Sequence, residues 1–457
     1  MTKENRTMIK NLSEKKGDEV VIKGWVDTVR FQGKMAFFDF RDVSGKVQGV
    51  IFGKPEILEK AKSIRPEFVV KVKGVVNERN DRVGKEYKEK LAETGKHEYF
   101  IKDVEIEITD IDVLNKAEIP FDLETDLNLD VYLDNMPFAL KKPKKQAIFK
   151  IQAKIIQKFR EYLNQNGFTE FMAPKIVGDD AEGGAGVYEV EYFGKKAGLA
   201  TSPQLYKQIM VGVLERVYTV GPAFRAEKHS TSRHLNEYTS LDFEMGFIED
   251  FRDVMKMHNG LLKYIVDEIQ KEMEVELNMF GVEKILAPEE FPVMSLPEAQ
   301  ELLEREFEGV KAVGEPDLEP EHERLLCQYA REKLGSDFIF ITHYPVSKRP
   351  FYTYKSKEEE YKGLTDSFDL LFKGVEITSG GQRIHDYDEL VQSMKDKGLD
   401  PEKFEFYLQA FKTGIPPHGG IGLGVERLTQ KILGLDNVKK ATLFPREINR
   451  IDTLLNK

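Results

Sequence analysis

Residues 221–247 bring together side chains whose types and spacing could bind a nucleoside triphosphate. Arg225 can place two parallel N–H groups on a phosphate, Glu227 can accept a hydrogen bond from an exocyclic amine, and Tyr238 can stack on a purine. The polar loop between them adds cationic side chains, among them His234. Taken alone, the stretch also fits a solvated β-hairpin with surface ion pairs, and that interpretation stays open at this point.

A glycine-rich run at residues 420–428, GIGLGVERL, favours the nucleotide site. Glycines let a backbone approach a ligand closely, and this run opens a predicted helix. Arg427 falls in the first turns of that helix and is expected to face the ligand that the glycines approach. The two stretches together therefore predict one phosphate-binding site built from distant parts of the chain.

Residues 366–388 offer oxygen ligands for a metal ion. Asp369, Glu376 and Ser379 are hard donors, of the kind that bind Mg²⁺ when the phosphates of a nucleotide supply further ligands. Asp369 and Glu376 are seven residues apart, so on a single strand they would point to opposite faces. We therefore predict a turn at residues 373–374 that brings the two carboxylates together.

Hydrophobic patterns predict the elements that hold these residues. Alternation on both sides of the polar loop predicts strands around 221–226 and 238–245. Apolar residues at helical spacing predict a helix from about Lys144 to Gly167, followed by a strand over 168–177 that contains Pro174.

The N-terminal part has a different pattern. Short strands separated by glycine-containing turns, with one short helix near residues 55–64, predict a small barrel. The charged segment at residues 79–98 is either an extended loop or a helical insert. Helices predicted between 248 and 363 carry no catalytic constellation and are interpreted as scaffold. The stretch RPFYTY, with Arg349 and Tyr352, is predicted to edge the site.

Three stretches of the chain, in the expected order, resemble the three signature motifs of class II aminoacyl-tRNA synthetases. The helix at 144–167 with its strand matches the first motif, the FRAE hairpin the second and GIGLGVERL the third. The barrel segment, with GWV and FFDFRD, resembles the OB-fold anticodon-binding domain of the class IIb branch. The resemblance covers most of the chain and implies an α+β fold. It implies an N-terminal OB-fold β-barrel over 1–112, a linker over 113–142, and a class II catalytic domain, an antiparallel sheet flanked by helices, over 143–457.

The resemblance implies a two-step reaction: ATP activates an amino acid as its adenylate, and the aminoacyl group then passes to the 3′ end of a tRNA. Arg225 and Arg427 would be the catalytic residues. The implied ATP site consists of Arg225, Glu227, His234, Tyr238, Glu376 and Arg427, and the implied Mg²⁺ ligands are Asp369, Glu376 and Ser379.

Residues 366–388 resemble the metal-binding strand of the aspartyl branch of the family, and Lys207 matches a lysine that is not expected in asparaginyl relatives. The interval from 247 to 363 is too short for the large inserted domain of typical bacterial aspartyl enzymes, so the resemblance is to the compact archaeal form. The implied aspartate site consists of Glu182, Gln204, Lys207, Asp242, Ser379 and Arg383. Because asparagine would leave Lys207 and Arg383 without an anion, we expect discrimination of roughly three decades or more. The alternatives are an asparaginyl enzyme, a lysyl enzyme, an ammonia-dependent asparagine synthetase, and a non-catalytic RNA-binding paralogue.

The resemblance also implies contacts with the anticodon. Phe37 matches a base-stacking position, Gln48 a base-reading position and Arg30 an RNA contact, and an aromatic, cationic barrel face suits single-stranded RNA. The partner is expected to be tRNA(Asp), with tRNA(Asn) left open. Asp27, which follows GWV, occupies a position that influences this choice in compact relatives.

Composition sets the remaining expectations. A net charge of −11 argues against a protein that coats nucleic acid, but not against local basic patches. No apolar run approaches the roughly 18 residues of a membrane span. The N-terminus has no apolar signal segment, and Cys327 is the only cysteine, so we predict a cytoplasmic protein. The first-motif helix predicts a homodimer.

Overall fold

The computed structural model describes residues 5–94, 98–118, 127–178 and 186–455. It divides into two compact units, Met1–Thr125 and Asp126–Lys457. The boundary falls inside the segment predicted as a linker at 113–142. None of the helices in the described ranges is long and apolar enough to cross a membrane.

The first unit is a closed barrel with the strand order β1-β2-β3-β5-β4. Its elements are β1 (Glu19–Gln32), β2 (Met35–Asp42), β3 (Gly45–Phe52), α1 (Pro55–Ala61), β4 (Val69–Glu78), α2 (Arg82–Thr94) and β5 (Phe100–Asn115), with a short 3-10 helix at Ile9–Glu14. Alternate residues such as Ala36, Phe38 and Phe40 fill the interior. The charged segment at 79–98 contains α2, so the helical alternative for it is confirmed.

The second unit is built on an eight-stranded sheet with the order β12-β13-β14-β15-β16-β11-β10-β6. All neighbouring strands are antiparallel except the pairs β12–β13 and β10–β6. The strands are β6 (Thr169–Glu170), β10 (Arg216–Phe224), β11 (Glu237–Gly246), β12 (Val293–Ser295), β13 (Phe338–Thr342), β14 (Ser367–Phe372), β15 (Val375–Arg383) and β16 (His418–Gly424). A smaller sheet contains β7 (Ile176–Val177), β8 (Glu189–Tyr192) and β9 (Lys195–Leu199).

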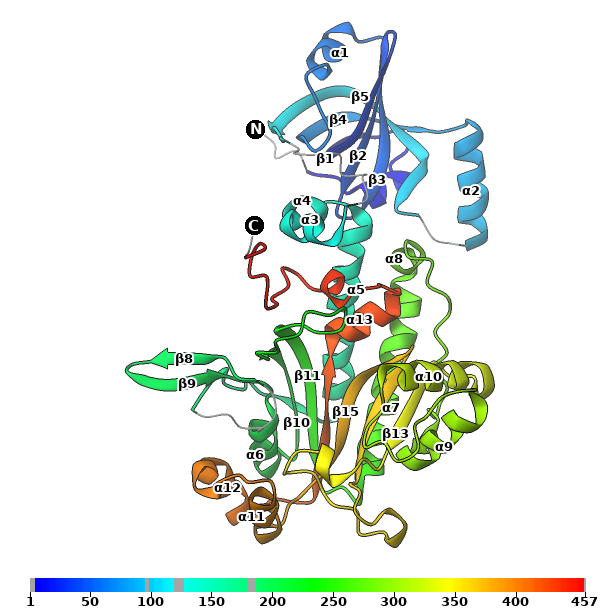
Figure 1. Ribbon diagram of the computed structural model, residues 1–457. Coiled ribbons are helices and arrows are strands. Elements are labelled where there is room, and N and C mark those ends of the chain that lie inside the picture. The colour runs from blue at the N-terminus through cyan, green and yellow to red at the C-terminus, as the bar shows by residue number, and fades with distance from the viewer. Residues whose placement is uncertain (1–4, 95–97, 119–126, 179–185, 456–457) are drawn as a thin grey trace. The chain divides into compact units, whose positions relative to one another are not determined.

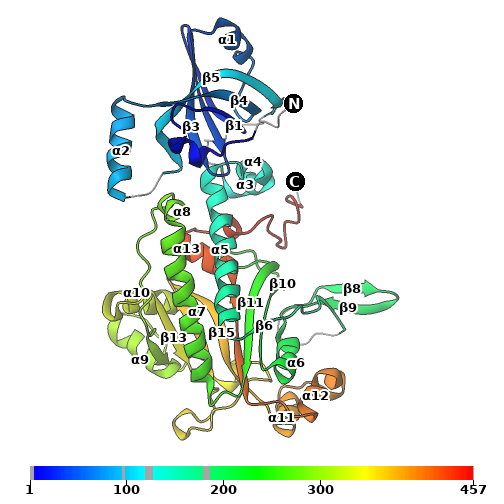
Figure 2. The ribbon, with the colours of Figure 1, turned by 180° about the vertical axis from the view of Figure 1, so that it is seen from behind.

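Helices surround this sheet (Figure 1). They are α3 (Leu129–Asp134), α4 (Met136–Ala139), α5 (Pro143–Gln165), α6 (Gln204–Leu214), α7 (Phe251–Glu272), α8 (Glu274–Asn278), α9 (Leu296–Glu306), α10 (Pro320–Leu334), α11 (Tyr387–Asp396), α12 (Glu405–Lys412) and α13 (Val425–Leu433). Short 3-10 helices lie at Val346–Lys348, Glu359–Tyr361, Pro401–Phe404 and Val438–Ala441. Figure 2 shows α5 and α7 side by side across one face of the sheet. Their apolar residues, with Leu241 and Phe243 of β11, form the main core.

The predicted strand over 168–177 is wrong as a single strand. β6 pairs with β10 in the large sheet, whereas β7 pairs with β9 in the small one. Pro174 lies between them, and proline has no N–H to donate to a sheet. The chain therefore leaves one sheet before it enters the other.

Candidate active site and RNA-binding face

A cavity of about 300 Å³ lies in the second unit, lined by residues of α6, β11, β15, β16 and α13 and of the loops beside them. Most of the residues predicted for ATP and amino-acid binding line it. They are Gln204, Lys207, Arg225, Glu227, His234, Tyr238, Asp242, Glu376, Ser379, Arg383 and Arg427. Glu182, also predicted for the amino acid, lies outside the described residues.

The hairpin predicted at 221–247 is formed by β10 and β11. Because side chains alternate along a strand, Leu241 and Phe243 enter the core, whereas Ser240 and Asp242 face the cavity. Glu244 lies on the same face of β11 as Ser240 and Asp242 and is fully buried.

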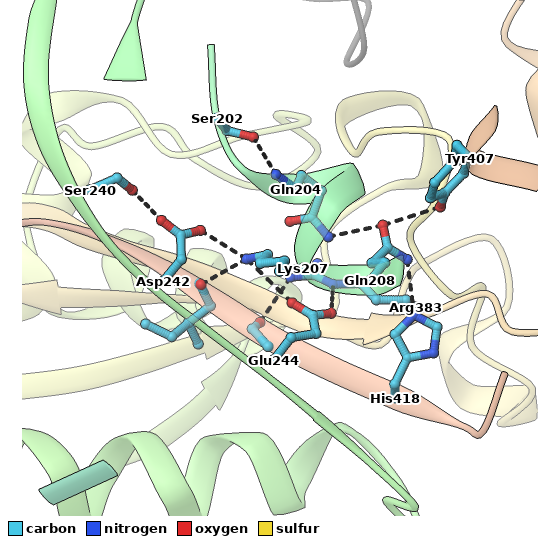
Figure 3. Close-up of polar contacts among 12 residues, drawn as sticks. Ser202, Gln204, Lys207, Gln208, Ser240, Asp242, Glu244, Arg383, Tyr407 and His418 are labelled. Atoms are coloured by element: carbon cyan, nitrogen blue, oxygen red, sulfur yellow. Dashed lines mark hydrogen bonds and ion pairs between the residues drawn. The ribbon is translucent and has the colours of Figure 1, made fainter. Parts of the chain in front are cut away.

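Four buried charged side chains meet in one cluster (Figure 3), and three of them, Lys207, Asp242 and Arg383, line the cavity. The Lys207 ammonium donates to Asp242 Oδ2 at 2.9 Å and to the Ile421 carbonyl at 2.8 Å. It also lies 3.3 Å from Glu244 Oε2. Arg383 Nε donates to Glu244 Oε1 at 2.9 Å. Two cations therefore share two carboxylates, and the cluster is neutral when all four groups are ionised.

Glu244 overturns one expectation. We expected asparagine to leave Lys207 and Arg383 without an anion, but Glu244 already forms ion pairs with both. Burial opposes ionisation of Glu244, yet the two cations outweigh it and hold the pKa of its carboxyl below the ordinary value. A count of cations is therefore not sufficient to explain the selection of an amino-acid side chain.

The glycines of β16 make room for these carboxylates. Gly420 and Gly422 lie directly opposite Glu244 and Asp242 in the antiparallel pair β11–β16. A Cβ atom on Gly420 would lie 2.2 Å from Glu244 Oε2, and one on Gly422 would lie 3.2 Å from Asp242 Oδ2. The glycine-rich run thus admits carboxylates of the neighbouring strand, a role that its sequence alone did not indicate.

The predicted turn at residues 373–374 is present between β14 and β15, and both residues have positive φ. The turn alone would not bring Glu376 to the face of Asp369. The register shifts within the pair, so that Leu371 faces Glu376 while Leu370 faces Thr378. This bulge moves Glu376 to the side on which Asp369 and Ser379 lie, because one extra residue reverses the alternation.

The Ser379 hydroxyl lies 2.8 Å from both Asp369 Oδ1 and Glu376 Oε1. Burial raises the pKa of Asp369 to about 6, against the opposing effect of Arg349 2.8 Å away. Burial also opposes ionisation of Glu376, but Arg427, Ser379 and Arg349 outweigh it and lower its pKa. One hydroxyl hydrogen cannot serve two carboxylates, so this set of hard oxygens suits a cation. Asp369 itself lies behind Ser379 and is absent from the cavity lining.

The other side of the cavity carries the residues predicted for the nucleotide. The Arg225 guanidinium lies 5.4 Å from the centre of the Tyr238 ring. His234 Nε2 lies 3.7 Å from Glu227, and burial and neighbouring cations lower the pKa of its imidazole. Arg427 donates to the Glu376 carbonyl at 3.0 Å, which fixes its position at the start of α13.

Two residues of this site, Glu244 and Glu426, were missed from the sequence. Glu426 lines the cavity and accepts the Thr239 N–H on both of its oxygens. Burial raises the pKa of Glu426 to about 7. The alternation of Ser240, Asp242 and Glu244 could have identified Glu244. Arg349 and Tyr352, which were predicted to edge the site, both line the cavity.

In the first unit, the three predicted anticodon residues lie on the outer face of the barrel. Arg30 and Phe37 are directly opposite each other in β1 and β2. Phe37 is half-buried, while its neighbours Ala36 and Phe38 are in the core. Gln48 of β3 faces Asp39, two residues along the same face from Phe37, and donates to Glu105 at 3.0 Å.

Asp27 belongs to a network of charges beside this face. Its carboxylate accepts a hydrogen bond from Lys46 and lies 3.5 Å from Arg41 Nη1. Arg41 also donates to Glu67 at 2.7 Å. Asp27 is therefore held in a defined orientation by two cations.

Comparisons with known proteins agree with both units. A family model described as tRNA synthetases class II (D, K and N) matches residues 128–448, and one described as OB-fold nucleic acid binding domain matches residues 20–114. The chain is 44% identical over 452 residues to the aspartate–tRNA(Asp/Asn) ligase of Thermus thermophilus, covering 98% of this chain and 99% of that protein. It is 42% identical over 455 residues to the ligase of the same name from Deinococcus radiodurans, covering 98% of each chain.

A solved structure, asparaginyl-tRNA synthetase from Pyrococcus horikoshii complexed with asparaginyl-adenylate, matches with a TM-score of 0.86 and 31% identity. The match covers 98% of this chain and 99% of that one. The predicted fold class, an OB-fold barrel followed by a class II catalytic domain, is confirmed. The chain therefore belongs to the class II tRNA synthetases of the D, K and N group.

Proposed function

We propose that this chain is an aspartate–tRNA ligase and that the cavity of the second unit is where it joins L-aspartate to ATP. The observation that carries the proposal is the content of one cavity. Arg225 and Arg427, which suit phosphates, line it together with Lys207 and Arg383, which suit carboxylates. The ligase names of relatives at 44% and 42% identity over nearly the whole chain support the same substrate.

In the first step, a carboxylate oxygen of aspartate attacks the α-phosphorus of ATP. The bond to the β-phosphate oxygen breaks, and pyrophosphate leaves with that electron pair. The step requires no protein nucleophile, only positioning and neutralisation of charge. In this proposal Arg225 holds the α-phosphate and the attacking carboxylate, and His234 and Arg427 hold the γ-phosphate. Glu227 and Tyr238 bind the adenine.

The set of Asp369, Glu376 and Ser379 fits Mg²⁺. No group of three or more His, Cys, Asp or Glu side chains suited to a metal occurs among the described residues, so further ligands must come from elsewhere. Mg²⁺ commonly takes one or two carboxylates and completes its shell with waters and phosphates. Bound there, the ion would neutralise phosphate charge during the attack.

Lys207 and Arg383 are proposed to bind the side-chain carboxylate of aspartate. The Lys207 ammonium donates two of its three hydrogens to the protein. Arg383 donates from Nε to Glu244 and from Nη2 to the Gly420 carbonyl at 2.9 Å. Arg383 retains N–H hydrogens for a ligand, and its acceptors fix where those hydrogens point. The third hydrogen of the Lys207 ammonium would be shared between the ligand and Glu244 Oε2, which lies 3.3 Å away. Gln204 and Asp242 are proposed to meet the α-ammonium.

Arg383→Ala tests this pocket. We expect the variant to lose aspartate-dependent exchange of pyrophosphate into ATP while its affinity for ATP, measured by equilibrium binding, is retained. An unchanged exchange rate would refute the role of Arg383. If asparagine supported exchange in the unaltered protein and aspartate did not, the asparaginyl alternative would replace the present proposal.

In the second step, a ribose hydroxyl at the 3′ end of tRNA displaces AMP and accepts the aspartyl group. We propose that the barrel binds the anticodon through Arg30, Phe37 and Gln48. Labelled aspartate and purified transcripts of tRNA(Asp) and tRNA(Asn) would test the range of tRNAs. Charging of the first alone indicates discrimination at the first anticodon base, and charging of both indicates a relaxed enzyme.

We also propose a cytoplasmic homodimer. The apolar residues of α5, the first-motif helix, are buried within a single chain, so this helix serves the core of the chain as well. Sedimentation at micromolar concentration tests the proposal, because a monomer there would contradict it.

A further inference from the structure

A chain of buried hydrogen bonds lies behind Gln204, beneath the proposed amino-acid pocket (Figure 3). Gln204 Nε2 donates to Gln208 Oε1 at 3.0 Å, and the Tyr407 hydroxyl donates to the same oxygen at 3.2 Å. Gln208 Nε2 lies 2.9 Å from His418 Nε2, and His418 Nδ1 lies 2.8 Å from the Pro416 carbonyl oxygen. Gln208 and His418 are 0% exposed, so solvent cannot compensate for a mismatched donor or acceptor.

The backbone carbonyl of Pro416 sets the donor and acceptor direction of every hydrogen bond in this series. A carbonyl only accepts, so His418 must carry a hydrogen on Nδ1. In a neutral imidazole Nε2 is then an acceptor, which requires the NH₂ group of Gln208 to face His418. Gln208 therefore turns its oxygen toward Gln204, and Gln204 must turn its own NH₂ group toward Gln208.

His418 is neutral because of its surroundings. Burial lowers the pKa of its imidazole to about 4, although the nearby Glu244 carboxylate acts in the opposite direction. Only the neutral form satisfies both Pro416 and Gln208 in the arrangement described. The last group in the chain is the carbonyl oxygen of Gln204, which points away from Gln208 in Figure 3.

We propose that Gln208 and His418 are positioning residues that hold the Gln204 amide with its oxygen toward the cavity, where it accepts a hydrogen bond from the α-ammonium of the amino acid. Tyr407 supports them through its bond to Gln208. The inference rests on the proposed function, because it assumes that an amino acid binds beside Gln204. Without these hydrogen bonds the Gln204 amide could turn its NH₂ group toward the cavity, where it would repel an ammonium.

Two substitutions of Gln208 separate orientation from packing. Gln208→Met keeps the volume but removes the acceptor for Gln204. Gln208→Glu keeps that acceptor, and its second oxygen would be matched by protonation of His418. We expect Gln208→Met to weaken L-aspartate binding by tenfold to a hundredfold, on the order expected for an unmatched buried donor, and Gln208→Glu to bind within a few-fold of the unaltered protein.

The ligand that isolates the effect is succinate, which is aspartate without the ammonium. Dissociation constants of the full chain for L-aspartate and succinate would be measured by calorimetry and by competition. Gln208→Met should leave the succinate constant within about twofold, since orientation of the Gln204 oxygen matters only to an ammonium. Equal weakening of both ligands, or a Gln208→Glu variant as weak as Gln208→Met, would overturn the proposal. Gln300→Met is the matched control, because Gln300 is a buried glutamine of α9 whose amide donates to the Glu315 carbonyl and does not line the cavity.

The tautomer of His418 gives a test that needs no ligand and no functional variant. Selective ¹⁵N labelling of histidine, with His418→Asn for assignment, should show hydrogen on Nδ1 and none on Nε2 at neutral pH. Hydrogen on Nε2 would overturn the proposal even if the protein binds aspartate. A protein with the expected tautomer and no binding of aspartate would instead refute the proposed function.

Discussion

Replacing Lys207 with methionine removes the ammonium of the buried charge cluster and keeps most of the side-chain volume. Lys207 is 1% exposed, and its ammonium contacts Asp242 Oδ2, Glu244 Oε2 and the Ile421 carbonyl. After the substitution, Asp242 and Glu244 share a single cation, Arg383, and one buried negative charge is uncompensated. Removing one partner of a buried ion pair typically costs about 3–5 kcal/mol. We therefore expect the free energy of unfolding of the second unit to fall by about this amount at neutral pH.

The structure also predicts how this loss can be reversed. Adding Glu244→Gln to Lys207→Met removes the uncompensated charge, and the glutamine oxygen can still accept from Arg383 Nε. We expect the double variant to be more stable than Lys207→Met by about 2 kcal/mol, within the usual range for directly coupled residues. Aspartate-dependent pyrophosphate exchange should stay lost in both variants, because neither has the Lys207 ammonium.

Urea unfolding of the single and double variants measures this coupling. Trp25 is the only tryptophan and belongs to the first unit, so its fluorescence reports the barrel, while circular dichroism also reports the helices of the second unit. The fluorescence transition should stay unchanged in every variant. Lys158→Met is the matched control: Lys158 is a buried lysine of α5 with three carboxylate partners, Glu161, Glu268 and Glu272. It should lose stability but retain aspartate activation.

The result that would refute the reasoning is additivity. If Glu244→Gln destabilised the Lys207→Met background as much as it destabilises the unaltered protein, Glu244 would not be the counterion of Lys207. The coupling of Lys207 to Glu244 would then be wrong, and Asp242 alone would be the counterion of Lys207.

Three further predictions concern other parts of the molecule. Phe37→Ala should raise the KM for tRNA by roughly tenfold or more, as expected for loss of a stacked base, and leave adenylate formation unchanged; a matching loss of barrel stability, followed by Trp25 fluorescence, would instead make Phe37 a core residue. Glu376→Gln should raise the Mg²⁺ concentration needed for half-maximal exchange by about tenfold or more, since it removes one of two carboxylates beside Ser379, and an unchanged Mg²⁺ requirement would argue against this site. His258 is buried against Thr378, and burial lowers the pKa of its imidazole to about 3. Below about pH 6.5 the unfolded protein therefore binds a proton at this histidine that the folded protein does not, and stability falls. Between pH 7 and pH 5 the unaltered protein should therefore lose about 2 kcal/mol more unfolding free energy than His258→Gln, and equal losses in urea titrations would contradict the assignment.

The sequence by itself determined the elements and most of the residues of the cavity. Alternation around the polar loop predicted β10 and β11, helical spacing predicted α5, and the side-chain types of Arg225, Lys207 and Arg383 indicated anionic ligands. These predictions succeed because local periodicity depends on which face of a strand or helix is buried, and residue type fixes charge and hydrogen-bonding capacity.

Only the tertiary structure decided how the charges are paired and oriented. Glu244 meets Lys207 and Arg383 because three segments far apart in the chain converge there. Glu376 reaches the face of Ser379 through a bulge that the spacing of the sequence does not reveal. The orientation of the Gln204 amide depends on the carbonyl of Pro416, which is more than two hundred residues away. Such pairings depend on the register of strands and on the directions of buried donors, and neither is encoded in any single stretch of sequence.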